Sequence, residues 1–516
     1  MTRLATAVVV RPGGTTAADV LAVARDAAPV ELSAEATAAM RAFRQVVEQL
    51  AAGAAPVYGI STGFGALADR HIGPEQRVQL QHRVVRSHAA GLGDPVDAEV
   101  VRAMMFLRLK TLASGRTGAR PLIAATLAAI LNAGITPLVP RHGSLGCSGD
   151  LAPLAHCALV LIGEGEAAGP DGRVGPAREI LAAAGIEPVR LAAKEGLALI
   201  NGTDGMLGML ILSLADLARL CTVADITAAM STEALLGTDQ VLLPSLHLPL
   251  RPHPGQAASA DNMLRLLAGS QIVASHRLDD TRVQDAYSLR CAPQVAGAVR
   301  DTLAHASQVA DRELAAAIDN PVVLDDGTVS SNGNFHGAPL AYVLDFLAIA
   351  AADLGSMSER RTDRMLDPAR SGGLPAFLAA DPGVDSGLMI AHYTQAAMVS
   401  ENKRLAVPAS ADSIPTSAMQ EDHVSMGWSA ATKLRAATAN LARILAIELV
   451  AAARAIDLRA PLSPGPATGC VVEALREVVP GPGPDRHLAP ELAAAERLVT
   501  SGRVVEVAAS AAGPLA

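Results

Sequence analysis

Aromatic side chains are scarce in this sequence, which has one Trp, four Tyr and six Phe among 516 residues. Charged residues are also few, at 18%, whereas half of all residues are hydrophobic. The apolar mass therefore comes mainly from Ala, Leu, Val and Ile, a composition that favours closely packed helices. So apolar a chain can bury a large core and is not disordered. At roughly 150 residues per domain, its length corresponds to about three domain-sized units.

Basic charge and paired cysteines are lacking as well. The formal net charge of −9 argues against a nucleic acid as the main partner, because phosphate-binding surfaces are basic. The five cysteines form no Cys-X-X-Cys pair and are odd in number, which is typical of reduced thiols in the cytoplasm. The first residues contain too short an apolar run for a signal peptide. The most apolar stretch, residues 205–221, contains Asp216 and Arg219, which favours a buried helix over a membrane span. We therefore expect a soluble cytoplasmic protein with no nucleic-acid or membrane partner.

Helical spacing of apolar residues dominates the pattern. Between residues 430 and 459 the leucines recur at intervals that place them on one helix face, and Pro461 ends that helix. Residues 461–485 are rich in Gly and Pro and predict an exposed connection. The pattern predicts a mainly α fold with two parts. An irregular, Gly-rich N-terminal domain (residues 1–200) is followed by a long-helix bundle with C-terminal helices (residues 201–516).

The most unusual segment is residues 142–156, in which three glycines surround a Cys-Ser-Gly-Asp sequence. One interpretation is a turn whose Ser or Asp caps a helix that begins near Leu151. A phosphate-binding loop is disfavoured because no Lys follows the glycines. A zinc site is disfavoured because the Cys and His spacings match no closed site, so no metal is predicted.

A further interpretation concerns Cys147, Ser148 and Gly149. Gly149 has no side chain to keep its amide nitrogen from the carbonyl carbon of residue 147. Closure of that ring, with loss of water that includes the Ser148 hydroxyl, would leave an exocyclic alkene conjugated to an imidazolone. No ordinary side chain supplies such an electrophile.

Five blocks of this sequence resemble the aromatic amino acid ammonia-lyase family, and within it the branch that acts on histidine. In chain order they are Tyr58–Gly65, His142–His156, Glu195–Thr203, Val283–Arg290 and Gln420–Val424. The resemblance covers nearly the whole chain. It implies a prosthetic group, 4-methylidene-imidazole-5-one (MIO), formed autocatalytically from Cys147, Ser148 and Gly149, with Asp150 assisting ring formation.

The resemblance also implies catalytic roles for Tyr58, Ser148, Tyr287 and Glu421. Tyr58 matches the tyrosine proposed as the base for the β-proton, and a phenol with a pKa of about 10 needs its anion stabilised for that task. Glu421 is the rival base and would face the imidazole of the substrate. Without the resemblance, Tyr58 is equally well a packed loop aromatic, and Glu421 a carboxylate in the first turn of a helix.

Further residues are implied to contact the substrate or the prosthetic group: His88, Asn201, Gln284, Arg290 and Phe335. Arg290 matches the arginine that binds the substrate carboxylate, for which a bidentate guanidinium is suited. The alternatives are a surface salt bridge for Arg290, a capping role for Asn201 and core packing for Phe335. His88, which follows Ser87, is typical of the histidine branch, because an imidazole substrate needs polar partners.

Three positions depart from the commonest family pattern. Cys147 replaces alanine, Asp204 stands where many members have Gln, and Ser61 where many have Asn. Only the backbone carbonyl of Cys147 enters the ring, so cyclisation should be unaffected, although a thiol beside the electrophile is a possible complication. The other two changes concern fine tuning and not the reaction class.

The resemblance implies a carbon–nitrogen lyase that converts L-histidine to urocanate and ammonia, the first step of histidine breakdown. It implies a homotetramer with active sites shared between chains, and a fumarase-like fold with a long central helix bundle. The alternatives are an MIO-dependent tyrosine or phenylalanine ammonia-lyase or aminomutase, a pyridoxal-phosphate enzyme and a catalytically silent helical scaffold. The pyridoxal enzyme is disfavoured because no Lys lies in a Gly/Ser-rich phosphate cup.

Overall fold

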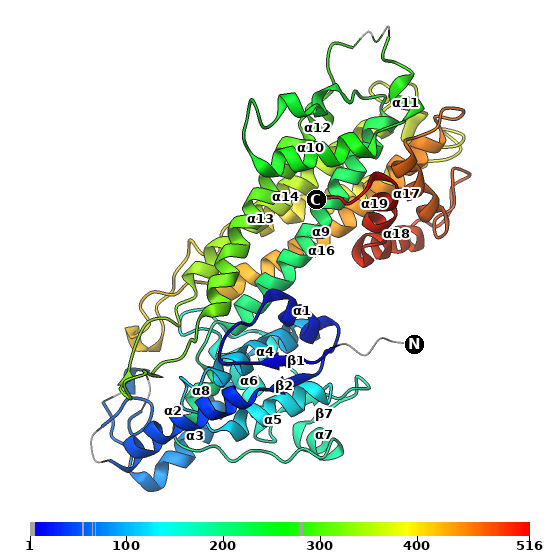
Figure 1. Ribbon diagram of the computed structural model, residues 1–516. Helices are drawn as coiled ribbons and strands as arrows, with labels where there is room; N and C mark the ends of the chain where they lie inside the picture. Colours follow the sequence, from blue (N-terminus) through cyan, green and yellow to red (C-terminus); the bar gives the residue numbers. More distant parts are fainter. Residues whose placement is uncertain (1–5, 54–55, 64, 68, 279, 281) are drawn as a thin grey trace. The chain divides into compact units, whose positions relative to one another are not determined.

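The computed structural model describes residues 6–53, 56–63, 65–67, 69–278, 280 and 282–516. Phe64, within the Tyr58–Gly65 motif, lies outside the described residues. The chain forms two compact units, each assembled from three segments (Figure 1). The first unit combines residues 1–212, 307–344 and 408–432, and the second combines residues 213–306, 345–407 and 433–516. The expected division into domains 1–200 and 201–516 stays a prediction.

Helices make up most of the first unit. They are α1 (Ala17–Arg25), α2 (Ala34–Ala52), α3 (Pro74–His88), α4 (Ala98–Ala113), α5 (Pro121–Asn132), α6 (Leu151–Leu161), α7 (Ala177–Ala183) and α8 (Glu195–Ile200), with the 3-10 turns η1 (Gly65–Leu67) and η5 (Ser417–Met419). Local sequence explains several helix starts. Thr16 and Asp19 form a capping box on α1, and proline stands at the first position of α3 and α5.

Short strands pair into small sheets in the same unit. β1 (Val8–Val10) and β2 (Val30–Leu32) are parallel, whereas β3 (Leu92–Pro95) and β5 (Pro140–His142) are antiparallel. β4 (Thr136–Pro137), β6 (Glu166–Ala168) and β7 (Val174–Pro176) form an antiparallel sheet, and β8 (Val322–Val323) pairs with β9 (Val329–Ser330). The N-terminal part is therefore more regular than its glycine content indicated, because helices such as α4 bury nearly every side chain.

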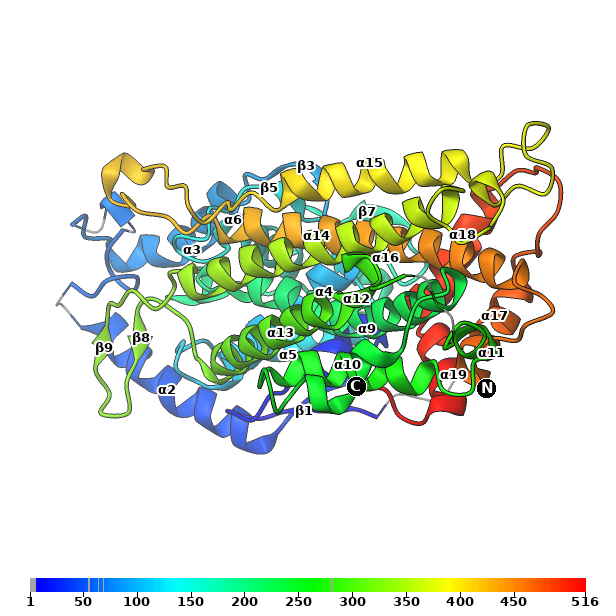
Figure 2. The ribbon, with the colours of Figure 1, turned by 90° about the horizontal axis from the view of Figure 1, so that it is seen from above.

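The second unit is built on long helices that also have residues in the first: α9 (Asp204–Ala234), α13 (Ala292–Ala315), α14 (Ala338–Leu366) and α16 (Gly427–Asp457). Within the second unit these helices run side by side (Figure 2). Glu448 on α16 accepts hydrogen bonds from Thr227 and Ser231 on α9 and pairs with Arg361 on α14, and all of these side chains are buried. The buried polar groups of this cluster are thus hydrogen-bonded or ion-paired to one another.

Shorter elements complete the second unit. They are α10 (Pro254–Leu266), α11 (Gln271–Ala274), α12 (Tyr287–Arg290), α15 (Met389–Leu405), α17 (Pro466–Arg476), α18 (Ala489–Ser501) and α19 (Arg503–Ala512), with the 3-10 turns η2 (Gln240–Leu242), η3 (Pro244–Leu246) and η4 (Ala376–Leu378). The predicted mainly α fold with long helices is confirmed. One detail was wrong: residues 461–485 are not simply an exposed connection. They contain α17, which begins at a proline and buries Val471 and Leu475.

By length and composition alone, α9, α14 and α16 are apolar enough to cross a membrane, which differs from the expectation from the sequence. In the structure, 72%, 56% and 83% of their most apolar windows are buried inside the protein. The apolar length of these helices therefore serves to a large extent as protein core. Asp216 and Arg219 interrupt the apolar stretch of α9 and form an ion pair with each other at 2.8 Å.

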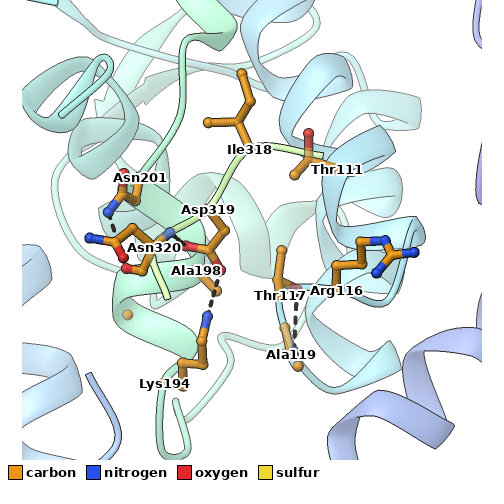
Figure 3. Close-up of polar contacts among 12 residues, drawn as sticks. Thr111, Arg116, Thr117, Ala119, Lys194, Ala198, Asn201, Ile318, Asp319 and Asn320 are labelled. Carbon is orange, nitrogen blue, oxygen red and sulfur yellow. Dashed lines mark hydrogen bonds and ion pairs between the residues drawn. The ribbon is translucent and has the colours of Figure 1, made fainter. Parts of the chain in front are cut away.

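A buried ion pair fixes one connection of the first unit. Lys194, just before α8, lies 2.5 Å from the carboxylate of Asp319, and the two side chains are 0% and 1% exposed (Figure 3). Burial lowers the pKa of Lys194, and the charge of Asp319 opposes that effect. The other carboxylate oxygen of Asp319 accepts the backbone N–H of Asn320 at 2.8 Å. The segment 318–320 is therefore held against α8.

We expect the change Asp319→Asn to lower the free energy of unfolding by about 3–5 kcal/mol, because it leaves the charge of Lys194 buried without its partner. Denaturant titration of the purified protein measures the effect as a lower unfolding midpoint. The matched control is Asp325→Asn, since Asp325 pairs with Arg116 at 3.0 Å but is 78% exposed. That variant should unfold close to the parent protein. Equal unfolding midpoints for the two variants would contradict the proposed contribution of the buried Lys194–Asp319 pair to stability.

Candidate active site

A cavity of about 1470 Å³ lies in the first unit. It is lined by residues from α3, the 145–151 loop, the end of α8 and the segments 320–336 and 417–423. Seven of the residues singled out from the sequence line it: Tyr58, His88, Cys147, Ser148, Asn201, Phe335 and Glu421. The first and last of them, Tyr58 and Glu421, are more than 360 residues apart in the sequence, so the fold and not the local sequence brings them together.

Five of the predicted site residues do not line this cavity: Gly149 and Asp150, which follow Ser148 in the same loop, and Gln284, Tyr287 and Arg290. Gln284, Tyr287 and Arg290 belong to the second unit, on and just before the short helix α12. Gln284 is exposed and Tyr287 is 70% exposed. The guanidinium carbon of Arg290 lies 4.9 Å from the centre of the Tyr287 ring, a cation–π contact.

The Cys147–Gly149 loop is pressed against the turn that follows α8. Gly149 has φ +72°, and a Cβ atom there would lie 2.1 Å from the carbonyl oxygen of Gly202. That same oxygen accepts the backbone N–H of Asp150 at 2.7 Å. On the other side of Gly202, a Cβ atom would overlap the guanidinium of Arg108. Only two glycines permit this approach, because any larger residue at either position collides with backbone or with a buried cation.

Asp150 fixes the far end of the loop. Its carboxylate is fully buried and accepts the backbone N–H groups of Gly205 and Met206, both at 2.9 Å, at the start of α9. The hydroxyl of Ser144 donates to its other oxygen at 2.9 Å. Burial raises the pKa of Asp150 to about 7, although these hydrogen bonds oppose the shift. Asp150 thus ties the triad loop to the first turn of a long helix.

Glu421 contacts the triad directly. Its Oε1 accepts the Ser148 hydroxyl at 3.4 Å, and its Oε2 accepts the Cys147 thiol at 3.3 Å and the Thr416 hydroxyl at 3.0 Å. Burial and the charge of Glu421 raise the pKa of the Cys147 thiol to about 12. The thiol therefore stays protonated at neutral pH and donates a hydrogen bond instead of acting as a nucleophile. Glu421 does not lie in the first turn of α16, which begins at Gly427.

His88 and Tyr58 occupy other parts of the wall. Burial lowers the pKa of His88, with the charge of Glu421 opposing the shift, so that its imidazole is neutral near pH 7. The Ser87 hydroxyl lies 3.1 Å from Nδ1 of His88. The phenolic oxygen of Tyr58 accepts the backbone N–H of Gly65 at 3.3 Å.

Asn201 caps the C-terminal end of α8 and also faces the cavity. Its Nδ2 donates to the carbonyl of Asn320 at 3.3 Å, as Figure 3 shows. Its Oδ1 is buried and has no hydrogen-bond partner among the described residues. A buried acceptor without a donor is costly, which indicates that this oxygen is reserved for a group bound in the cavity.

Two stacked histidines that were not predicted from the sequence also belong to the site. The rings of His336 and His423 lie 5.5 Å apart at an angle of 6°, and both residues line the cavity. His423 lies in the Gln420–Val424 block, and His336 immediately follows Phe335, so their positions in the sequence were an available signal. In the part of the chain that the structure describes, no group of three or more His, Cys, Asp or Glu side chains is arranged to hold a metal ion.

Comparison with known proteins places the chain among enzymes with related chemistry. The family model "Aromatic amino acid lyase" matches residues 15–477. The chain is 69% identical over 509 residues to a histidine ammonia-lyase of Streptomyces coelicolor, covering 98% of this chain and 99% of that protein. It is 70% identical over 512 residues to that of Streptomyces griseus, covering 99% of both.

Solved structures agree with the sequence relatives on the fold. A histidine ammonia-lyase from Trypanosoma cruzi superposes with a TM-score of 0.90 at 39% identity, covering 98% of this chain and 96% of that one. A tyrosine aminomutase from Streptomyces globisporus superposes with a TM-score of 0.92, also at 39% identity, covering 98% and 99%. The fold is therefore compatible with more than one reaction of the same chemical type.

We expect Gly149→Ala to disrupt the loop, because its Cβ would lie 2.1 Å from the Gly202 oxygen and the loop would have to move away. The control is Gly172→Ala, whose φ of +78° is similarly strained but whose surroundings contain no atom within 4 Å of the added Cβ. Thermal unfolding should show that the free energy of unfolding falls by at least about 3 kcal/mol in Gly149→Ala and by about 1 kcal/mol in Gly172→Ala. Similar losses in both variants would show that conformation alone, and not the contact with Gly202, requires the glycine.

Proposed function

Because the chain belongs to the aromatic amino acid lyase family, we propose that it is an ammonia-lyase that removes ammonia from L-histidine and leaves urocanate. The observation that carries this proposal is the cavity in which Ser148, Tyr58, His88 and Glu421 meet. It offers a candidate electrophile, a candidate base and polar partners for an imidazole within one cavity. The sequence relatives at about 70% identity, which are named histidine ammonia-lyases, support the choice of substrate.

Cys147, Ser148 and Gly149 fit the formation of the family's MIO group. Gly149 carries no side chain, and the backbone of Gly202 leaves no room for a Cβ atom at this position. Asp150 and Gly202 hold the loop in a tight turn, and the Oδ1 of Asn201 is an unfilled acceptor nearby. When formed, the group supplies an electrophile that activates the substrate towards loss of its amine.

Tyr58 is the proposed base for the β-proton. Its phenol lines the same cavity as Ser148, and its oxygen accepts the N–H of Gly65. Glu421 is the proposed partner of the substrate ring, because it lies beside the triad and its charge also acts on His88. Asn201 and Phe335 line the same cavity as the triad.

Specificity for histidine rests on the neutral imidazole of His88 and on the carboxylate of Glu421. Both can exchange hydrogen bonds with an imidazole, and an aromatic substrate without ring nitrogens would leave them unpaired at a cost. The main alternative is a tyrosine or phenylalanine ammonia-lyase or aminomutase, which the likeness to a tyrosine aminomutase favours. The products separate these activities: urocanate from histidine, coumarate from tyrosine, or a β-amino acid.

The substrate carboxylate is proposed to bind Arg290 of another copy of the chain. Arg290 is not part of the cavity wall, yet its Nε is buried without a hydrogen-bond partner among the described residues. Nearby, Val283 is 99% and Tyr287 70% exposed, more apolar surface than a short segment normally leaves in water. A homotetramer in which Gln284, Tyr287 and Arg290 complete a neighbour's cavity would account for all three observations.

We propose a cytoplasmic location from the state of the cysteines, and no nucleic-acid partner from the net charge. All five cysteines are free thiols, as expected where disulfides are kept reduced. The net charge of −9 gives no reason to expect binding to nucleic acid.

The change Ser148→Ala should lower kcat with histidine by at least about 10³-fold, because the triad then lacks the hydroxyl whose loss creates the electrophile. The experiment assays histidine, tyrosine and phenylalanine with both proteins and records intact masses. The parent should weigh two waters less than the encoded chain and produce urocanate. Free energies of unfolding that agree within about 1 kcal/mol would show that the fold is retained. A parent protein at its full encoded mass that leaves histidine untouched would refute the proposal.

Shared active sites predict complementation between two inactive variants. Ser148→Ala removes the electrophile and Arg290→Met removes the carboxylate partner, so each alone should lose at least about 10²-fold in kcat/KM. Coexpressed, the two chains would form mixed assemblies in which some cavities contain a native Ser148 from one chain and a native Arg290 from the other. Activity should then return in part. A coexpressed mixture as inactive as its components, although shown to be mixed by mass, would place the whole site in one chain.

A further inference from the structure

The two oxygens of the Glu421 carboxylate have different surroundings. Oε2 is held by two donors, the Thr416 hydroxyl at 3.0 Å and the Cys147 thiol at 3.3 Å. Oε1 has one contact, with the hydroxyl of Ser148 at 3.4 Å. A backbone pair between Thr416 and Glu421, with N···O distances of 3.0 and 3.3 Å, fixes the segment itself. One oxygen is thus anchored, and the other points at the hydroxyl that must leave when the prosthetic group forms.

We propose that Glu421 is the acid–base group for the loss of the Ser148 hydroxyl during maturation of the triad. The inference rests on the proposed function, since it concerns how Cys147, Ser148 and Gly149 become the electrophile. It assigns Glu421 a task before any substrate is bound, separate from its role beside the substrate ring.

Two waters leave the triad in steps that balance separately. In ring closure, the nitrogen of Gly149 bonds to the carbonyl carbon of Cys147, and the oxygen departs as water with the amide protons of Gly149 and Ser148. In the second step the Cα–H bond of Ser148 breaks, its electron pair forms the Cα=Cβ double bond, and the Cβ–Oγ bond breaks. The oxygen takes a proton and departs as water. A carboxylate beside Oγ can take the proton released from Cα and deliver it to the departing oxygen, so that its own charge is unchanged at the end.

Hydroxide is a poor leaving group, so delivery of the proton to Oγ controls this step. Glu421 Oε1 is within one hydrogen bond of that oxygen, although 3.4 Å is long for a hydroxyl–carboxylate pair. Such contacts are commonly loose before the reacting groups reach their final geometry. The distance is short enough that a small rotation of either side chain closes it.

The other acidic groups nearby are less suited to the step. Both oxygens of Asp150 are already occupied by the Ser144 hydroxyl and two backbone N–H groups. The thiol of Cys147 stays protonated and has turned its hydrogen towards Glu421. Asp422 also lines the cavity, but its side chain is exposed and the structure shows no hydrogen bond from it to the triad.

Maturation would then change the surroundings of Glu421. Loss of the Ser148 hydroxyl removes the partner of Oε1 while the two donors on Oε2 remain. A carboxylate oxygen left without a donor in a partly buried wall is unfavourable, so binding of a new donor there is favoured. The substrate ring can supply one, so a single side chain first makes the electrophile and then meets the substrate.

The test follows the intact mass of freshly synthesised full-length chain over time, for the parent, Glu421→Gln and Asp422→Asn. Glutamine keeps the shape of glutamate but can neither give nor take a proton. We expect Glu421→Gln to close the ring and accumulate a species that has lost one water, with the second loss at least about 10²-fold slower than in the parent. Asp422→Asn, which removes a carboxylate one residue away, should lose both waters at the parental rate.

Loss of both waters from Glu421→Gln at the parental rate would overturn the inference and leave the proposed function standing. A parent protein that loses no water would instead refute the proposed function. If Glu421→Gln does not fold, Thr416→Val decides, because it removes an anchor of Oε2 and keeps the carboxyl group. A second water loss slowed several-fold in Thr416→Val supports the inference, and a parental rate overturns it.

Discussion

The contact between Gly149 and Gly202 is the constraint on which the candidate site depends. The two backbones approach so closely that the Gly202 oxygen accepts the N–H of Asp150 and leaves no room for a Cβ at residue 149. Gly202 is in turn confined by Arg108, whose guanidinium also binds the Ala198 carbonyl at 3.1 Å and pairs with Asp204. Tight packing from both sides restricts the loop in advance and so lowers the entropic cost of closing a ring within the chain.

Departures from the family pattern become intelligible around this contact. Asp204 pairs with the buried Arg108, so an acid at this position supplies a counter-charge that an amide would not. The thiol of Cys147 does not compete with the electrophile, because burial and Glu421 keep it protonated. Both substitutions therefore take part in the same set of contacts that holds the triad loop and the carboxylate beside it.

Much of the helical fold could be predicted from the sequence, because the apolar residues of a helix recur at a spacing that is visible in the sequence. The run of leucines from residue 430 and the stop at Pro461 correspond closely to α16, Gly427–Asp457. The region 461–485 was misjudged, because Gly and Pro flank α17 and one proline starts it, so a punctuated composition concealed a short helix. The helical content of residues 1–200 was likewise understated, since glycine-rich loops alternate there with well-buried helices such as α4.

The sequence alone determined the triad, its glycine requirement and the set of candidate side chains, because these are properties of residue type and spacing. Only the tertiary structure decided which candidates meet: Tyr58, His88, Asn201, Phe335 and Glu421 join Ser148 in one cavity, whereas Gln284, Tyr287 and Arg290 lie elsewhere. It alone also paired His336 with His423 and placed Glu421 against Ser148. The reason is that proximity between residues hundreds of positions apart is set by how buried helices pack, and no local pattern of residues encodes that packing.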